Sequence, residues 1–261
     1  MHRNCSSHRV LRYRCEVFVG WKERLGRVGQ FLASARCLLC GAPGSGDIEL
    51  CVACANSLAR NTSHCERCAL PLARTATLCG DCLKEERPWQ VAWAPYRYGF
   101  PLDVLEARFK FGGNLVAGKV LSRQWIAAGA PPALPEVVVP VPLHVSRLRS
   151  RGFNQALELV KPVARHLGVR VDPRLLARVR RTDAQSELDA EARARNVLGA
   201  FEARFVEGLQ HVAVVDDVMT TGATLAECAL ALRAAGVARV DVWALARTPK
   251  PDFKRAEATQ L

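Results

Sequence analysis

Short apolar runs that alternate with amphipathic stretches set the architecture expected for the second half of the chain. Val137–Val141 and Val212–Val215 are unbroken apolar runs, which is typical of strands buried on both faces of a parallel sheet. The second run leads through a polar loop to a helix predicted over Leu225–Ala235, and then to a strand over Ala238–Ala246. Strands that alternate with helices indicate an α/β protein with a parallel sheet.

Three further helices are predicted from apolar residues at helical spacing. They cover Leu102–Phe111, Asn114–Ala128 and a segment that follows Gln155 and ends near Leu167. Pro162 lies inside the third helix. Because proline removes a backbone donor and collides with the preceding turn, we expect a kink or a break there.

The end of the second apolar run carries the strongest chemical signal. Two acids follow it, and a loop of hydroxyls and small residues then opens the predicted helix: Asp216, Asp217, Thr220, Thr221, Gly222, Ala223, Thr224. Ligands of open α/β sheets bind at the carboxyl ends of strands, and backbone N–H groups at a helix start favour phosphate. The phosphate would repel two carboxylates unless they accept hydrogen bonds from sugar hydroxyls or help to hold Mg²⁺. The segment therefore predicts a phosphorylated sugar as ligand; the alternative is an ordinary turn with an acidic strand end.

Eight of the eleven cysteines form four Cys-x-x-Cys pairs, with ten residues between successive pairs: Cys37/Cys40, Cys51/Cys54, Cys65/Cys68, Cys79/Cys82. Two residues between thiols let both sulfurs reach one tetrahedral Zn²⁺, so four pairs supply two closed structural sites. Disulfides are the alternative and require an oxidising compartment. Equal gaps leave the pairing open; we expect the first four and the last four cysteines to group, as in a duplicated ribbon.

The formal net charge is +12, and two Zn²⁺ on eight thiolates would leave it positive. A basic chain favours anionic partners, although a genome that favours arginine codons explains the count equally well. Arg147, Arg149 and Arg151 bind nucleic acid, bind pyrophosphate, or form a solvated face. We find no apolar run of about 18 residues and no signal-peptide pattern, so we expect a cytoplasmic protein without a transmembrane segment.

Residues 212–224 resemble the signature of type I phosphoribosyltransferases, which bind phosphoribosyl pyrophosphate (PRPP). Taken with the double ribbon, Val-Pro-Val-Pro-Leu-His (139–144) and Arg-Gly-Phe-Asn-Gln (151–155), the chain resembles the ComF family. These are phosphoribosyltransferase-like proteins associated with DNA uptake in competent bacteria and, in some bacteria, with gluconate utilisation. The resemblance implies a type I phosphoribosyltransferase-like parallel sheet flanked by helices, with an N-terminal zinc-ribbon module. The expected segments are a basic arm (1–34), a double ribbon (35–86), the phosphoribosyltransferase-like domain (90–248) and a polar tail (249–261).

The resemblance also implies roles for particular residues. Asp216 and Asp217 would face the ribose hydroxyls of PRPP with Mg²⁺, and the loop 220–224 would wrap the 5-phosphate. The segment 140–144 would cradle pyrophosphate, but two of its residues are prolines without an N–H, so binding depends on Val141, Leu143, His144 and nearby arginines. A flexible loop over 178–196 would close over the site, with Gln185 and Arg193 as ligand contacts.

Thr220 stands where purine-salvage relatives commonly place an aspartate that handles the proton of the base. A threonine cannot act as a base at neutral pH, which argues against a standard hypoxanthine/guanine enzyme and leaves the catalytic residue unidentified. We expect a PRPP-binding phosphoribosyltransferase with an unknown acceptor that supports DNA uptake. The alternative is a PRPP-sensing module that binds single-stranded DNA, together with the uptake machinery, without transferase turnover.

Overall fold

The computed structural model describes residues 35–74, 76–180, 195–204, 206–251 and 253. This part of the chain divides into two compact units at Val52/Ala53. The first unit contains the beginning of the ribbon that carries Cys37. The second unit contains the rest of that ribbon, the second ribbon and the α/β part of the chain. The arm expected over 1–34 lies outside the described residues.

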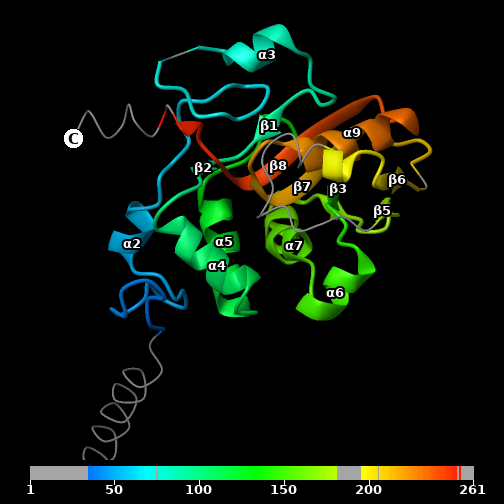
Figure 1. The fold of residues 1–261 in the computed structure, drawn as a ribbon. Coiled ribbons are helices and arrows are strands. Elements are labelled where there is room, and N and C mark those ends of the chain that lie inside the picture. Colours follow the sequence, from blue (N-terminus) through cyan, green and yellow to red (C-terminus); the bar gives the residue numbers. More distant parts are fainter. Residues whose placement is uncertain (1–34, 75, 181–194, 205, 252, 254–261) are drawn as a thin grey trace, which may run out of the picture. The chain divides into compact units, whose positions relative to one another are not determined.

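A parallel sheet forms the centre of the second unit (Figure 1). All of its paired strands are parallel, and β2 (Tyr96–Arg97) extends β1 along the same neighbour, β8. The path across the sheet is β1 (Ala92–Trp93), β8 (Arg239–Arg247), β7 (His211–Met219), β3 (Val137–Pro140) and β4 (Arg170–Val171). The mixed α/β fold with a parallel sheet that the apolar runs predict is confirmed.

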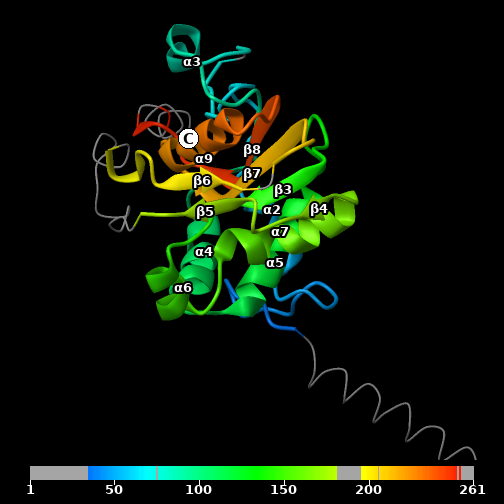
Figure 2. The same cartoon turned by 90° about the vertical axis from the view of Figure 1, so that its right-hand side faces the viewer.

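Helices cover both faces of the sheet. One face carries α9 (Ala223–Ala234), and the other carries α7 (Gln155–Leu167), against which α5 (Leu115–Ala127) and then α4 (Leu102–Lys110) pack (Figures 1 and 2). Two short strands that the sequence analysis missed, β5 (Leu176–Arg178) and β6 (Phe201–Ala203), form an antiparallel pair beside α9. The start of α7 is capped by Asn154, whose side chain accepts a hydrogen bond from the Leu157 amide.

The basic stretch after β3 is a short helix, α6 (Val145–Arg151), which the sequence analysis did not predict. It begins at His144, whose side chain accepts a hydrogen bond from the Ser146 amide, and it ends at Gly152, which is left-handed with φ 81°. None of its residues is buried. The hydrophobic periodicity that reveals the other helices is therefore missing from this one.

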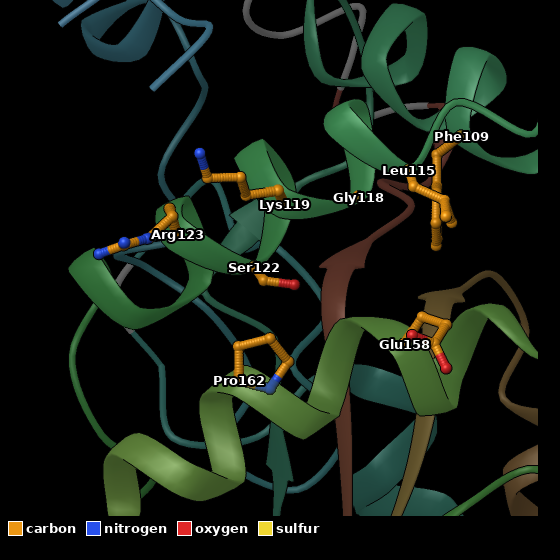
Figure 3. Close-up of a pocket in the computed structure, with 8 residues that line it drawn as sticks. All are labelled: Phe109, Leu115, Gly118, Lys119, Ser122, Arg123, Glu158 and Pro162. Carbon is orange, nitrogen blue, oxygen red and sulfur yellow. The ribbon is translucent and has the colours of Figure 1, made fainter. Parts of the chain in front are cut away.

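We expected a kink or a break at Pro162; no break occurs, because α7 runs through this residue as one helix. Its apolar face is buried against α5 and the sheet, and the Ser122 hydroxyl of α5 donates to the Leu159 carbonyl at 3.0 Å. Proline cannot bond to the Glu158 carbonyl one turn earlier, and both residues line a cavity of about 220 Å³ between α5 and α7 (Figure 3). Tertiary packing thus outweighs the local cost of proline.

Candidate functional site

The order of strands reverses between β3 and β7, and we call the region beyond the carboxyl ends of these two strands the crevice, the usual term at such a reversal. β4 follows β3 along the chain and pairs with one of its edges, whereas β7 pairs with the other edge. In open α/β sheets such a reversal marks the place where ligands bind, beyond the carboxyl ends of the strands. β3 stops at Pro140 opposite Val215, while β7 continues along β8 to Met219. Asp216 and the residues after it therefore lie beyond the end of β3.

Two carboxylates follow Val215 at this edge, and their environments differ. Asp217 is 7% exposed, and its Oδ2 lies 3.0 Å from Lys110 Nζ of α4. Burial raises the pKa of Asp217, but the charge and hydrogen bond of Lys110 outweigh this effect and lower the pKa. Asp216 is partly buried, and desolvation followed by the charge of Asp217 raises its pKa to about 7. Perturbed carboxylates in a crevice are typical of functional sites.

The loop between β7 and α9 leaves its hydroxyl groups accessible. Thr221 is exposed, and Thr220 and Thr224 are partly exposed. Gly222 has φ 83°, and a Cβ there would lie 2.7 Å from Met219 Cε. The loop conformation therefore needs glycine at this position, and it presents the start of a twelve-residue helix to the crevice.

Arg178 on β5 lies within electrostatic range of both Asp216 and Arg147. Burial lowers the pKa of Arg178 on β5, the charge of Arg147 on α6 lowers it further, and the charge of Asp216 opposes them. Positive charge from two arginines within electrostatic range of each other favours an anion nearby. Arg147 was a candidate from the sequence but Arg178 was not, because no local pattern relates β5 to α6.

The segment after β3 contributes less than expected. The Val141 amide donates to the Val215 carbonyl at 2.8 Å, so this donor is engaged in the sheet. Asn154 Nδ2 donates to the Val141 carbonyl at 2.9 Å and fixes the chain direction there. That Val141, Leu143 and His144 hold pyrophosphate stays a prediction, with the Val141 amide already engaged in the sheet. The two loop contacts expected at positions 185 and 193 lie outside the described residues.

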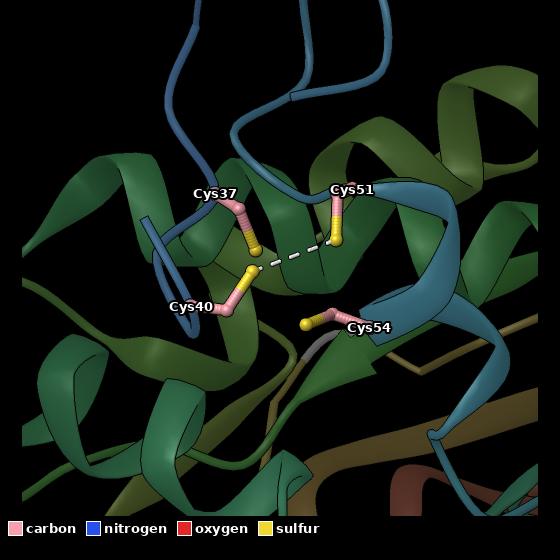
Figure 4. A group of neighbouring side chains, drawn as sticks. All are labelled: Cys37, Cys40, Cys51 and Cys54. Carbon is pink, nitrogen blue, oxygen red and sulfur yellow. Dashed lines mark hydrogen bonds between the residues drawn. The ribbon is translucent and has the colours of Figure 1, made fainter. Parts of the chain in front are cut away.

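The eight cysteines form two clusters, the first four and the last four, as expected. Within each cluster the four sulfurs lie within 4.8 Å of one another. Cys40 and Cys51 sulfurs are 3.7 Å apart (Figure 4), and Cys68 and Cys79 sulfurs are 3.6 Å apart. A tetrahedron with Zn–S bonds of about 2.3 Å places its sulfurs about 3.8 Å apart, so both clusters fit Zn²⁺.

The charge balance of the second cluster also fits a cation. Burial and the charges of neighbouring thiols raise the pKa of Cys68. Metal ligands must be thiolates, and four thiolates in this environment need a positive ion among them. The two ribbons share one turn geometry: Gly41 (φ 76°) donates to the Cys37 carbonyl, and Ala69 (φ 53°) donates to the Cys65 carbonyl. This repetition supports a duplicated ribbon.

These features define an α/β protein with two Cys₄ zinc-binding sites. Similarity to known proteins shows which family of such proteins it belongs to. The family model of the double zinc ribbon domain matches residues 28–83. DNA utilization protein YhgH of Salmonella typhi is 37% identical over 222 residues, which is 81% of this chain and 96% of that protein. The protein of the same name from Escherichia coli is 35% identical over 221 residues, again 81% and 96%. Competence protein F of Haemophilus influenzae is 36% identical over 177 residues, or 64% of this chain and 77% of that protein.

The chain therefore belongs to the family of YhgH and competence protein F, the ComF family, as the order of its motifs indicated. Among the described residues, the helices are all too short or too polar to cross a membrane.

Proposed function

We propose that this protein binds PRPP at the crevice between β3 and β7 and that it acts in DNA uptake. The proposal rests on one observation. Beyond the end of β3, two acids are followed by a loop of exposed or partly exposed threonines at the start of α9. A phosphorylated sugar needs both acceptors for its hydroxyls and donors for its phosphate. The crevice offers both within one strand–loop–helix segment.

The ligand groups follow from the chemistry of each part of the crevice. The 5-phosphate lies against Thr220–Thr224, where backbone N–H groups and the helix dipole favour an anion. Asp216 and Asp217 accept hydrogen bonds from the ribose hydroxyls, and Mg²⁺ accompanies the pyrophosphate. Arg178, which lies within electrostatic range of Asp216 and Arg147, supplies positive charge that suits pyrophosphate.

PRPP binding is common to a phosphoribosyltransferase and to a PRPP sensor. We favour a transferase with an acceptor still to be found, since the loop and both acids are intact. Thr220 cannot serve as the base that a standard purine enzyme uses. Release of pyrophosphate from PRPP in the presence of candidate acceptors, with and without single-stranded DNA, separates the two functions.

A second candidate function, binding of single-stranded DNA, is favoured by the surface around α6. Phe111 is 73% exposed, and Arg151 Cζ lies 5.9 Å from the centre of its ring. Arg149 on the same helix is also exposed. An exposed aromatic ring beside arginines suits stacking of a base and contact with phosphates. The names of the relatives, DNA utilization protein and competence protein F, agree with such a partner.

Calorimetry with PRPP and Mg²⁺ tests the main proposal. Replacing both acids, Asp216→Asn with Asp217→Asn, removes both carboxyl groups and should abolish measurable binding. Glu207→Gln, at an exposed carboxylate after β6, is the matched control and should bind as the original protein does. A folded double variant with unchanged affinity would overturn the site assignment.

A further inference from the structure

Arg247, the last residue of β8, joins two parts of the second unit that are far apart in sequence. Its side chain is buried, with 6% of the residue exposed. Nε donates to the Cys68 carbonyl at 3.1 Å. The two N–H groups of Nη1 are shared among the carbonyls of Met219 (3.0 Å), Thr220 and Thr248 (2.9 Å). One guanidinium therefore binds the knuckle of the second zinc site and the loop of the candidate anion site.

The direction of these bonds matters for the loop. In a trans peptide unit the C=O and N–H groups point in opposite directions. When Arg247 holds the carbonyls of Met219 and Thr220, the amides of Thr220 and Thr221 point away from it. Donors that are oriented before an anion arrives bind it more tightly, because no ordering remains to be done.

A second connection runs parallel to the first. Trp89 Nε1 donates to the carbonyl of Arg67, which lies between the two cysteines of the same knuckle, at 2.7 Å. The ring of Trp89 also lies against Gly222, where an added Cβ would be 3.2 Å from Cη2. The backbone of the knuckle thus fixes the loop through two buried side chains.

We propose that Arg247 is a positioning residue that couples metal binding at the second Cys₄ site to anion binding at Thr220–Thr224. The inference rests on the proposed function, since the anion is the 5-phosphate of PRPP. Zn²⁺ fixes the Cys65–Cys68 knuckle, the knuckle carbonyl fixes Arg247, and Arg247 fixes the loop peptides. Coupling between two sites is reciprocal, so PRPP should also raise the affinity of this site for zinc. None of the four carbonyls that Arg247 binds belongs to the first ribbon.

The first test compares Arg247→Met and Arg247→Lys in the full-length, zinc-loaded protein. Methionine keeps the bulk and removes every donor, so the Kd for PRPP with Mg²⁺ should rise about tenfold or more. Lysine keeps the charge but not the fork of donors. The Kd of the Lys variant should therefore lie between those of the original protein and the Met variant. Both variants should retain the zinc content of the original protein. A folded Met variant with unchanged PRPP affinity overturns the proposal.

The second test needs no PRPP and applies even if the Met variant fails to fold. Cys79→Ser disables the second zinc site, and Cys40→Ser is the matched control at the first. Hydrogen exchange of the amides 220–224 should quicken about tenfold in the Cys79 variant alone, while β7 stays protected. Equal exchange in both variants overturns the coupling. If the original protein binds no PRPP but only Cys79→Ser loosens the loop, the proposed function fails and the coupling holds.

Discussion

Lys110 Nζ lies 3.0 Å from Asp217 Oδ2, and it lies equally close, at 3.0 Å, to Glu106 Oε1 one turn back on α4. The ammonium group of Lys110 on α4 thus forms ion pairs with two carboxylates, and one of these, Asp217, lies at the crevice. The charge of Lys110 keeps the pKa of Asp217 low against the effect of burial. Asp217 therefore remains an ionised acceptor at neutral pH.

Lys110→Met should weaken both the fold and the ligand site. Removing one partner of a buried ion pair costs about 3–5 kcal/mol, and we expect about 2 kcal/mol because the Lys110 side chain is 27% exposed. Urea denaturation at pH 7 measures the loss. Lys161→Met, which breaks the exposed pair with Glu158 on α7, is the control and should cost about 0.5 kcal/mol or less. Equal losses would mean that the Lys110 pair contributes no more than a surface pair.

Asp216 should make stability fall with rising pH. Its pKa is raised from 3.8 to about 7 in the fold, so the folded protein keeps a proton that the unfolded chain has already released. The resulting stability is present below about pH 4 and is lost as the pH rises towards 7. Asp216→Asn should flatten this dependence and raise the free energy of unfolding at pH 8 by about 2 kcal/mol, less than the full linkage value because the side chain is only partly buried.

Asp217→Asn is the informative contrast, because the pKa of Asp217 is lowered rather than raised. That carboxylate contributes stability above its unfolded pKa, and the contribution is lost as the pH falls through the folded value. The asparagine variant should therefore be less stable than the original protein at pH 8. Thermal unfolding at pH 5 and pH 8 checks both variants. A stabilising Asp217→Asn would show that the two acids have been assigned in the wrong order.

The two zinc sites should contribute differently to the stability of the fold. Elemental analysis should give about two Zn²⁺ per chain, and about one after either Cys40→Ser or Cys79→Ser. The sulfurs of the second cluster are buried in the same hydrophobic core as the strands, whereas Cys40 is exposed. Cys79→Ser should therefore lower Tm by several degrees more than Cys40→Ser. A single zinc in the original protein would contradict the geometry of one cluster.

Binding of single-stranded DNA should depend on α6 and Phe111. Replacing Arg149 and Arg151 by alanine should reduce the slope of log affinity against log salt by about 1.4, at about 0.7 per lost phosphate contact. Phe111→Ala should leave the slope unchanged and cost about 1 kcal/mol of stacking at every salt concentration. Anisotropy titrations from low to moderate salt separate the two effects.

Arg165 and Arg233, exposed on α7 and α9, provide the control for that experiment. Their double alanine variant removes the same net charge from other helices. If it lowers the slope as much as the α6 variant, binding follows the overall charge and not this surface. If no binding appears at low salt, the α6 arginines form a solvated face or bind pyrophosphate.

The features that could be predicted from the sequence are those determined by residues close together in the chain. Asp216 and Asp217, the loop to Thr224 and the cysteine pairs are continuous motifs, and periodicity revealed the buried strands and long helices. Lys110, Arg178 and Arg247 escaped because each acts on a segment that only the folded chain brings near. The helix α6 escaped because it buries no apolar face. The break considered at Pro162 does not occur, because the packing of α7 outweighs the local cost of proline.

The place of β8 in the sheet has a consequence for synthesis of the protein. β8 lies between β1 and β7, yet it is the last strand of the sheet to leave the ribosome. The thiols that bind metal emerge early, whereas the partner of Cys68 at position 247 emerges 179 residues later. A nascent or truncated chain can load its ribbons but cannot close its sheet or support the loop. Fragments that end before this strand should therefore accumulate as zinc-bound, aggregation-prone species.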